Sequence, residues 1–320
     1  MASETVEAEE NVAGPTFESR VGLRHTLSRT LENTATKLSL AVIVVITGTA
    51  LFAFVDAKLL DYYIANTYLY NPRSAPLSSQ PLLPPVGLSN EFGTGTLAHP
   101  LGTDDRGRDI VIRLVYGSRI AMQVALVSTT IGMVVGTTVG AVAGYYGGRV
   151  DDVIMRLTEV LYSIPFLVLV IAFMTAFGRD LLYAMIGVSL VSIPIFARLI
   201  RSEVLSVREA TYVEAAKAVG GRDRDILVRH VIPNSFAPVV VQATLQMGTN
   251  ILIVAGLSFL GFGAQAPIPS WGQMLSIARN YMLPNPWFSI WPGLAILVTV
   301  MAFNIIGDGL RDTLDPRLKE

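Results

Sequence analysis

The sequence predicts an all-α integral membrane protein with six transmembrane helices. Three observations lead to this fold class: 52% of the 320 residues are hydrophobic, only 15% are charged, and the apolar residues gather in long runs. A soluble domain carries about 25% charged residues, and a spanning helix needs about 20 apolar ones. The runs do not alternate with period two, which favours helices over barrel strands. One large soluble domain is the disfavoured alternative.

The six candidate spans are 38–55, 120–146, 153–177, 181–199, 236–262 and 287–306. Gly178-Arg179-Asp180 joins the third span to the fourth so tightly that the two must be antiparallel neighbours. Pro165 and Pro194 lie inside spans, and we expect them to kink their helices. The predicted organisation is an N-terminal tail (1–37), an anchor (38–55), an extracytoplasmic outer segment (56–119), a core of five spans (120–306) and a C-terminal tail (307–320).

The distribution of basic residues predicts the orientation. The N-terminal tail begins with acidic residues, unlike a secretory signal, so we expect 38–55 to be a retained anchor. With this tail inside, most of the 24 Lys and Arg residues fall on the cytoplasmic side. The short outer loops keep only Arg179 and Arg279, as the positive-inside rule requires. Both termini are therefore predicted to be cytoplasmic.

The sequence shows no motor of its own. The spans hold almost no ionisable side chain, whereas ion-coupled carriers need such groups to bind the coupling ion. Those near the span ends include Arg156, Glu159 and Asp308. No lysine is followed by Ser or Thr, so the phosphate-binding G-x-x-x-x-G-K-[ST] loop is absent. The chain has no cysteine, and no paired carboxylates or Ser/His pair stand near membrane depth, which disfavours a membrane-embedded enzyme. A separate subunit is expected to supply the energy.

A polar segment at 212–234 interrupts the apolar pattern between the fourth and fifth spans. Thr211 is expected to cap a helix that runs through Val219, and Gly220-Gly221 to stop it in a left-handed turn. Asp223 is expected to cap a second helix, 224–231, which ends before Pro233. The segment therefore predicts a helix presented to a partner in the cytoplasm. A helix lying on the lipid headgroups is the alternative.

Three motifs resemble the permease subunits of binding-protein-dependent ABC importers, in the dipeptide/oligopeptide/nickel branch. The first is the "EAA" pattern of the polar segment, Tyr212-Val213-Glu214-Ala215-Ala216 with Gly220, Ile226, Arg229-His230 and Ile232-Pro233-Asn234. The second is Leu101-Gly102-Thr103-Asp104-Asp105 with Gly107-Arg108-Asp109 and Tyr116-Gly117-Ser118-Arg119. The third runs from Leu257 to Gly263 and continues at Trp271-Gly272-Gln273-Met274-Leu275. The resemblance covers about residues 38–320.

The resemblance implies a type I importer permease fold in a bacterial or archaeal cytoplasmic membrane. It also implies the partners: a second, similar permease, two cytoplasmic ATPases that bind ATP and Mg, and an extracytoplasmic binding protein, with no nucleic acid. The loop at 203–233 would be the coupling loop, and its contact residues Tyr212, Glu214, Ala215, Ala216, Gly220, Ile226, Arg229, His230 and Pro233. The chain itself would hold no cofactor, metal or catalytic residue. We refer to 212–234 below as the coupling segment.

The solute is expected to be a di- or oligopeptide. Relatives in the branch also handle glutathione and nickel chelates, which stay open as alternatives. Many members carry an acidic residue where this chain has Ile253 and Val254, which disfavours a cationic solute such as nickel. A stand-alone channel or facilitator and an ABC exporter half are the remaining alternatives, and neither explains the coupling segment.

Two residue patterns inside the spans have competing interpretations. Four glycines at four-residue spacing in the second span predict close helix packing, or alternatively a glycine-lined passage; they are Gly132, Gly136, Gly140 and Gly144. A polar stripe in the fifth span predicts interhelical hydrogen bonds or a neutral lining of the translocation path; its residues are Gln242, Gln246, Thr249 and Asn250.

The acidic residues of the outer segment are expected to act structurally or in docking. Asp104, Asp105 and Asp109 lack the regular spacing and closing Glu of a calcium loop, so a metal site is disfavoured. Capping of a helix that begins near Asp109, or contact with the binding protein, is favoured. The stretch 68–95 is rich in Pro, Ser, Gly and Asn and is expected to be irregular.

Overall fold

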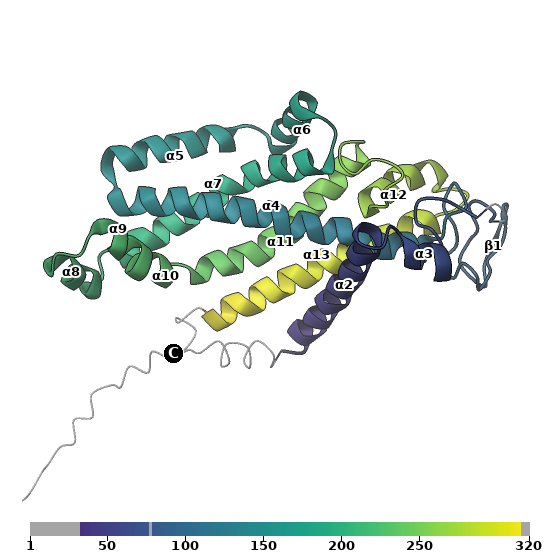
Figure 1. The fold of residues 1–320 in the computed structure, drawn as a ribbon, viewed down its shortest axis with the longest axis horizontal. Coiled ribbons are helices and arrows are strands. Elements are labelled where there is room, and N and C mark those ends of the chain that lie inside the picture. Colours follow the sequence, from purple (N-terminus) through teal and green to yellow (C-terminus); the bar gives the residue numbers. More distant parts are fainter. Residues whose placement is uncertain (1–32, 77–78, 315–320) are drawn as a thin grey trace, which may run out of the picture.

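The computed structural model describes residues 33–76 and 79–314, so the acidic residues of the predicted N-terminal tail lie outside the described residues. Long helices form a bundle, and short elements gather at its two ends (Figure 1). Within the described ranges, five helices are long and apolar enough to cross a membrane: α2 (Thr34–Lys58), α4 (Ile110–Tyr146), α7 (Leu181–Val207), α11 (Ala237–Phe259) and α13 (Trp287–Leu314).

The short elements mark the two ends of the bundle (Figure 1). The coupling segment forms one end, with α8 (Thr211–Ala218), α9 (Asp223–Ile226), a π turn (Leu227–Val231) and α10 (Ile232–Asn234). The outer segment forms the other, with α3 (Tyr63–Tyr68) and an antiparallel hairpin of β1 (Ser89–Asn90) and β2 (Gly93–Thr94). Near the outer segment lie α12 (Trp271–Ala278) and a 3-10 turn (Arg279–Tyr281). Most of the predicted irregular stretch at 68–95 has no regular structure where it is described.

The predicted third span at 153–177 is broken into two helices at Pro165, where a kink was expected. The chain forms α5 (Gly148–Ser163) and α6 (Phe166–Phe177), which are bent by 89° to each other, so a sixth crossing exists only if the pair is counted as one span. Ile164 and Pro165 between them both have extended backbone, with ψ 126°. The residue before a proline is forced out of the helical region, and proline cannot donate the helical hydrogen bond. Pro194, by contrast, lies inside the continuous helix α7.

Helix α4 is the central element of the bundle. It has 37 residues, about 55 Å at 1.5 Å per residue. It packs most extensively against α7 and also against α2 and α11, while α13 packs against α11 and α2. Asp109 caps its first turn, because the carboxylate Oδ1 accepts the Ile112 N–H at 2.9 Å. Capping of a helix that begins near Asp109 is therefore confirmed.

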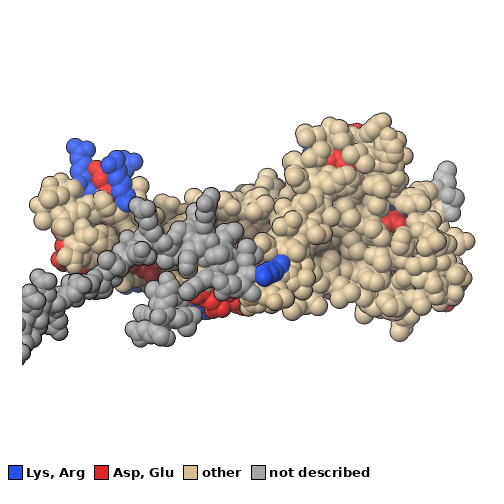
Figure 2. Space-filling model, turned by 90° about the horizontal axis from the view of Figure 1, so that it is seen from below, with Lys and Arg blue, Asp and Glu red and all other residues tan. Residues whose placement is uncertain are grey.

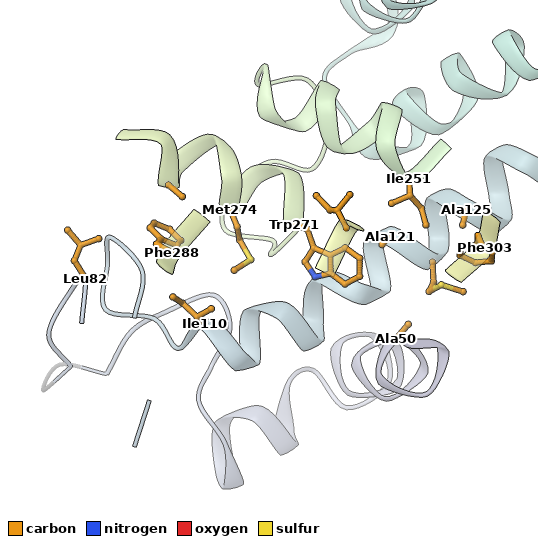
Figure 3. Packing of buried hydrophobic residues seen from close by; sticks show 13 residues of the cluster. Ala50, Leu82, Ile110, Ala121, Ala125, Ile251, Trp271, Met274, Phe288 and Phe303 are labelled. Atoms are coloured by element: carbon orange, nitrogen blue, oxygen red, sulfur yellow. The ribbon is translucent and has the colours of Figure 1, made fainter. Parts of the chain in front are cut away.

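The apolar core near the outer segment is built around one indole ring (Figure 3). Trp271 is buried, and its Nε1 donates to the Leu114 carbonyl of α4 at 2.9 Å. A Cβ at Gly117 would stand 2.6 Å from this ring, so only glycine lets α12 approach α4 so closely. Met274 and Phe288 complete the cluster beside Ile110, at the start of α4.

Charged side chains are sparse on the face shown in Figure 2, most of which is occupied by other residue types. Lys and Arg atoms gather at the end that carries α8. Large apolar side chains are exposed along the long helices, among them Leu38, Val44 and Leu51 of α2 and Val134 of α4. Such an apolar outer surface is expected of helices that face lipid.

Candidate coupling surface and translocation lining

Helix α8 presents a small, mostly polar surface and is held to the bundle by one buried side chain, Val213. Val213 is fully buried, whereas Glu214, Ala215 and Lys217 are exposed and Ala216 is half-buried. Glu214 lies in the first turn, where a carboxylate is stabilised by the positive end of the helix dipole. One negative charge beside two alanines leaves a flat patch, which suits insertion into a groove of another protein.

The turn after α8 has the predicted form. Gly220 has φ +80°, in the left-handed region that glycine adopts without strain, so the predicted stop is confirmed. A Cβ at Gly221 would lie 2.8 Å from the Ala216 carbonyl oxygen, so this position also requires glycine. The two glycines let the chain reverse immediately after α8 and keep Val219, 86% exposed, at the tip.

Two predicted caps in the coupling segment are wrong. The N-cap of α8 is Ala210, which has no side-chain acceptor, and Thr211 is the first helical residue. Arg222, and not Asp223, precedes α9. The carboxylate of Asp223 instead accepts a hydrogen bond at 2.9 Å from the hydroxyl of Tyr145, in the last turn of α4. A tertiary contact has replaced the local cap, which sequence spacing alone does not reveal.

The second predicted helix, 224–231, is also wrong in its extent. The chain passes from α9 through the π turn into α10, which includes Pro233. The Ile232 N–H donates to the Leu227 carbonyl, five residues back. In a regular α-helix the proline ring clashes with the carbonyl four residues earlier, and the wider turn accommodates it.

The predicted contact residues of this region do not share one surface. Ile226 is only 2% exposed and packs in a core cluster with Val213, Tyr145 and Ile200. Arg229, His230 and Pro233 are exposed, as is Tyr212. Ile226 therefore helps to hold the coupling segment to the ends of α4 and α7, while the exposed contact residues are accessible to a partner.

Two arginines, Arg201 and Arg208, hold the neighbouring helices together. Arg208 Nη1 donates to the Gly144 carbonyl at 2.9 Å and so satisfies an unpaired carbonyl in the last turn of α4. Arg201 of α7 makes a bidentate ion pair with Asp151 of α5, and its Nε lies 2.6 Å from Oδ1. The two residues of each pair lie 50 and 64 positions apart in the sequence, so no local pattern predicts either contact.

The four glycines of the second span all face α7. A Cβ at Gly136 would lie 2.6 Å from the Ile193 carbonyl oxygen, and one at Gly140 would lie 2.2 Å from that of Ala197. A Cβ at Gly132 would likewise lie too close to the Ser192 side chain, and a Cβ at Gly144 would lie too close to the Arg201 carbonyl oxygen. Within the described chain the row is therefore filled by the backbone of α7.

The polar stripe of the fifth span divides between two environments. Gln246 and Asn250 are buried, and Gln246 Nε2 donates to Asn250 Oδ1 at 2.9 Å. Asn250 Nδ2 in turn donates to the Thr129 hydroxyl of α4 at 3.0 Å. Gln242 is half-buried, and Thr249 is exposed with its hydroxyl on its own helix at the Leu245 carbonyl. The four residues lie on one face of α11, which is buried on the side of Gln246 and Asn250 and accessible on the side of Gln242 and Thr249.

Gln246→Leu is expected to lower the thermal stability of the assembled protein. Leucine removes the donor to Asn250 and leaves a buried amide oxygen with weaker partners, which costs about 1–3 kcal/mol. Thr249→Val, at an exposed position, is the matched control and should leave the melting temperature unchanged. If Gln246→Leu lowers solute uptake but leaves the melting temperature unchanged, the residue acts in the path instead of in the interior network.

The acidic residues Asp104 and Asp109 of the outer segment are paired with basic side chains. Asp104 is fully buried and pairs with Arg108 Nε at 2.6 Å and Arg113 Nε at 3.2 Å. Asp109 Oδ2 lies 2.8 Å from His99 Nδ1, at the start of α4. In the part of the chain that the structure describes, no group of three His, Cys, Asp or Glu residues is placed to hold a metal. These contacts fix the outer segment on α4.

Asp105→Asn is expected to stabilise the outer segment at neutral pH. Burial and, second, the neighbouring Asp104 raise the pKa of Asp105 above its ordinary value. Protonated Asp105 therefore favours the folded state, and this contribution is lost as the pH rises through the folded-state pKa. The asparagine variant should melt at a higher temperature than wild type at pH 7.5, and the difference should shrink as the pH falls toward 4. A constant difference across this range would contradict the electrostatic origin.

Fold and site together define a multi-pass membrane protein with a short, exposed helix at one end. Comparison with known families identifies it further. Residues 136–320 match the family of binding-protein-dependent transport system inner membrane components, and the chain belongs to this family. The protein is thus a transporter permease subunit and a multi-pass membrane protein.

Curated relatives agree with this membership. The chain is 45% identical to the dipeptide transport system permease protein DppC of Alkalihalophilus pseudofirmus, over 77% of this chain and 81% of the relative. It is 46% identical to the glutathione transport system permease protein GsiD of Pectobacterium atrosepticum, over 69% and 74%. The probable D,D-dipeptide permease DdpC of Escherichia coli is 41% identical, over 78% and 80%.

A solved structure confirms the fold. An inward-facing conformation of the MetNI methionine ABC transporter superposes with a TM-score of 0.54 at 21% identity, over 64% of this chain and 98% of that one. The predicted type I importer permease fold is therefore confirmed.

Proposed function

We propose that this chain forms one half of the translocation path of an ATP-driven importer for di- and oligopeptides. The observation that best supports a peptide as the solute is the 45% identity to a dipeptide permease over 77% of the chain. Glutathione, itself a short peptide, is the second candidate, because a glutathione permease is 46% identical over 69% of the chain.

The proposed partners are a second permease, two cytoplasmic ATPases that bind ATP and Mg, and an extracytoplasmic binding protein. The exposed patch of α8 supports the ATPase contact, since Glu214, Ala215 and Gly220 protrude from a firmly packed base. The chain then contributes conformational change and no covalent step or cofactor. This assignment places α8 and both termini on the cytoplasmic side of a bacterial or archaeal membrane.

The proposed path is lined by uncharged polar groups. Thr249 and the half-buried Gln242 of α11 are the members of the polar stripe that remain accessible in the single subunit. A neutral lining suits a peptide backbone without selecting its side chains. Solute selection would then rest mainly with the binding protein.

Purification of the tagged chain from its native membrane tests the assembly. Native mass spectrometry should find one copy of the chain with one further permease and two ATPase copies. Labelled dipeptide should then accumulate in vesicles that contain this complex and the binding protein, and unlabelled glutathione should compete only if it shares the path. A chain that purifies alone and forms no complex with ATPases would refute the proposal.

A further inference from the structure

One aromatic side chain joins the end of α4 to both short helices of the coupling segment. Tyr145 is 8% exposed and lies in the last turn of α4. Its hydroxyl donates to Asp223 Oδ1, at the start of α9, at 2.9 Å. The Nζ of Lys217, near the end of α8, lies 5.5 Å from the centre of its ring. Tyr145 therefore contacts the chain on both sides of the Gly220-Gly221 turn.

The two contacts differ from the surrounding packing because they are polar and directional. A hydrogen bond to a carboxylate is stronger than one between neutral groups, and a cation over an aromatic face adds a further attraction. Within the described residues, Asp223 and Lys217 form no ion pair, so Tyr145 is their side-chain partner. Losing the hydroxyl would leave α9 held to α4 by apolar contacts alone.

The α4 end of this contact is closely packed and hydrogen-bonded. Arg208 Nη1 holds the Gly144 carbonyl at 2.9 Å, and the glycine row presses α4 against the backbone of α7. At its other end α4 begins at Asp109, which His99 of the outer segment contacts at 2.8 Å. One continuous helix of 37 residues thus connects the outer segment to the coupling segment.

We propose that Tyr145 is a positioning residue through which α4 and the coupling segment move together. The proposal rests on the proposed function, and it assigns the route by which binding-protein docking reaches the ATPases. Docking displaces the outer end of α4, and Tyr145 carries the displacement to α8 and α9. The core around Val213 and Ile226 supports the coupling segment through non-directional apolar contacts, whereas the hydrogen bond of Tyr145 fixes the position of Asp223 relative to α4.

Tyr145→Phe in the complete complex is the direct test. The ring, its packing and its contact with Lys217 remain, and only the hydrogen bond to Asp223 is lost. Complex assembly and basal ATPase activity should stay at the wild-type level. The stimulation of ATPase activity by loaded binding protein, and the solute imported per ATP, should fall about tenfold, which equals about 1.4 kcal/mol of coupling. A purely structural role would lower assembly and both activities together.

Three further variants complete the experiment. Tyr146→Phe makes the same change at the adjacent, 50% exposed residue and should behave as wild type. Asp223→Asn keeps an oxygen acceptor and should retain most of the stimulation, whereas Asp223→Ala should reproduce the loss. Asp223 is exposed, so its variants test the contact even if Tyr145→Phe assembles poorly.

The outcomes separate this proposal from the function on which it rests. Wild-type stimulation in Tyr145→Phe, or losses that add in the Tyr145→Phe/Asp223→Ala double variant, would overturn the role of Tyr145. A wild-type complex that shows neither ATPase association nor stimulation would instead overturn the proposed function.

Discussion

Glu214→Lys should uncouple solute uptake while the subunit still inserts and pairs with its neighbouring permease: this is the largest effect that we expect from one substitution. Glu214 is exposed in the first turn of α8 and provides the single negative charge of the flat patch. Reversal places a cation at the positive end of the helix dipole and opposite any basic groove of an ATPase. Uptake into vesicles should fall at least tenfold, and the ATPases should dissociate during purification.

Two controls isolate the role of this charge. Glu214→Gln removes the charge without reversing it and should give an intermediate loss. Glu209→Lys makes the same reversal at an exposed position before α8 and should leave uptake near wild type. Normal uptake by Glu214→Lys, with ATPases retained, would count against α8 as the coupling contact.

Gly140→Ala is expected to destabilise the subunit more than any other single-methyl substitution in the glycine row. The new Cβ would lie 2.2 Å from the Ala197 carbonyl oxygen and 2.7 Å from its Cα, and neither backbone atom can move without shifting α7. Overpacking of this kind costs about 1–3 kcal/mol or more. The melting temperature of the purified complex should fall, and the fraction of assembled complex should fall with it.

Gly48→Ala is the matched control, because nothing lies within 4 Å of a Cβ at Gly48 of α2. Alanine in an open helical position is favoured over glycine by about 0.5–1 kcal/mol, so this variant should melt at the wild-type temperature or above it. Equal stability of the two alanine variants would show that the row is not a packing surface.

Helices and turns that depend on local sequence patterns could be predicted from the sequence. Apolar runs located α2, α4, α7, α11 and α13, although with boundaries that differ by several residues. Asp109 correctly predicted the start of α4, and Gly220 correctly predicted the end of α8. A cap and a left-handed turn depend only on nearby backbone, so both are visible in the local sequence.

Features that depend on tertiary contacts were missed. Pro165 and Pro194 have similar positions inside apolar runs, yet the chain breaks at Pro165 and continues as a helix through Pro194, where α7 packs extensively against α4. Asp223 had the composition of a cap, but Tyr145 from 78 residues away takes its carboxylate. The buried polar pair Gln246 and Asn250 was found as a stripe, whereas its partner Thr129 on α4 was not.

The same limit applies to the site. The EAA pattern located the coupling segment, and the exposed surface of α8 follows from its polar composition. Ile226 was grouped with the contact residues because it belongs to the motif, and the structure places it in the core. Motif membership therefore does not distinguish residues that face a partner from residues that support them.

The central claim is that this subunit moves solute uphill only when an ATPase drives it. The direct measurement is uptake of labelled dipeptide by proteoliposomes that contain the two permeases and the binding protein, with and without the ATPases and ATP. We expect accumulation above the external concentration only when ATPases and ATP are both present. Accumulation without them would contradict the account.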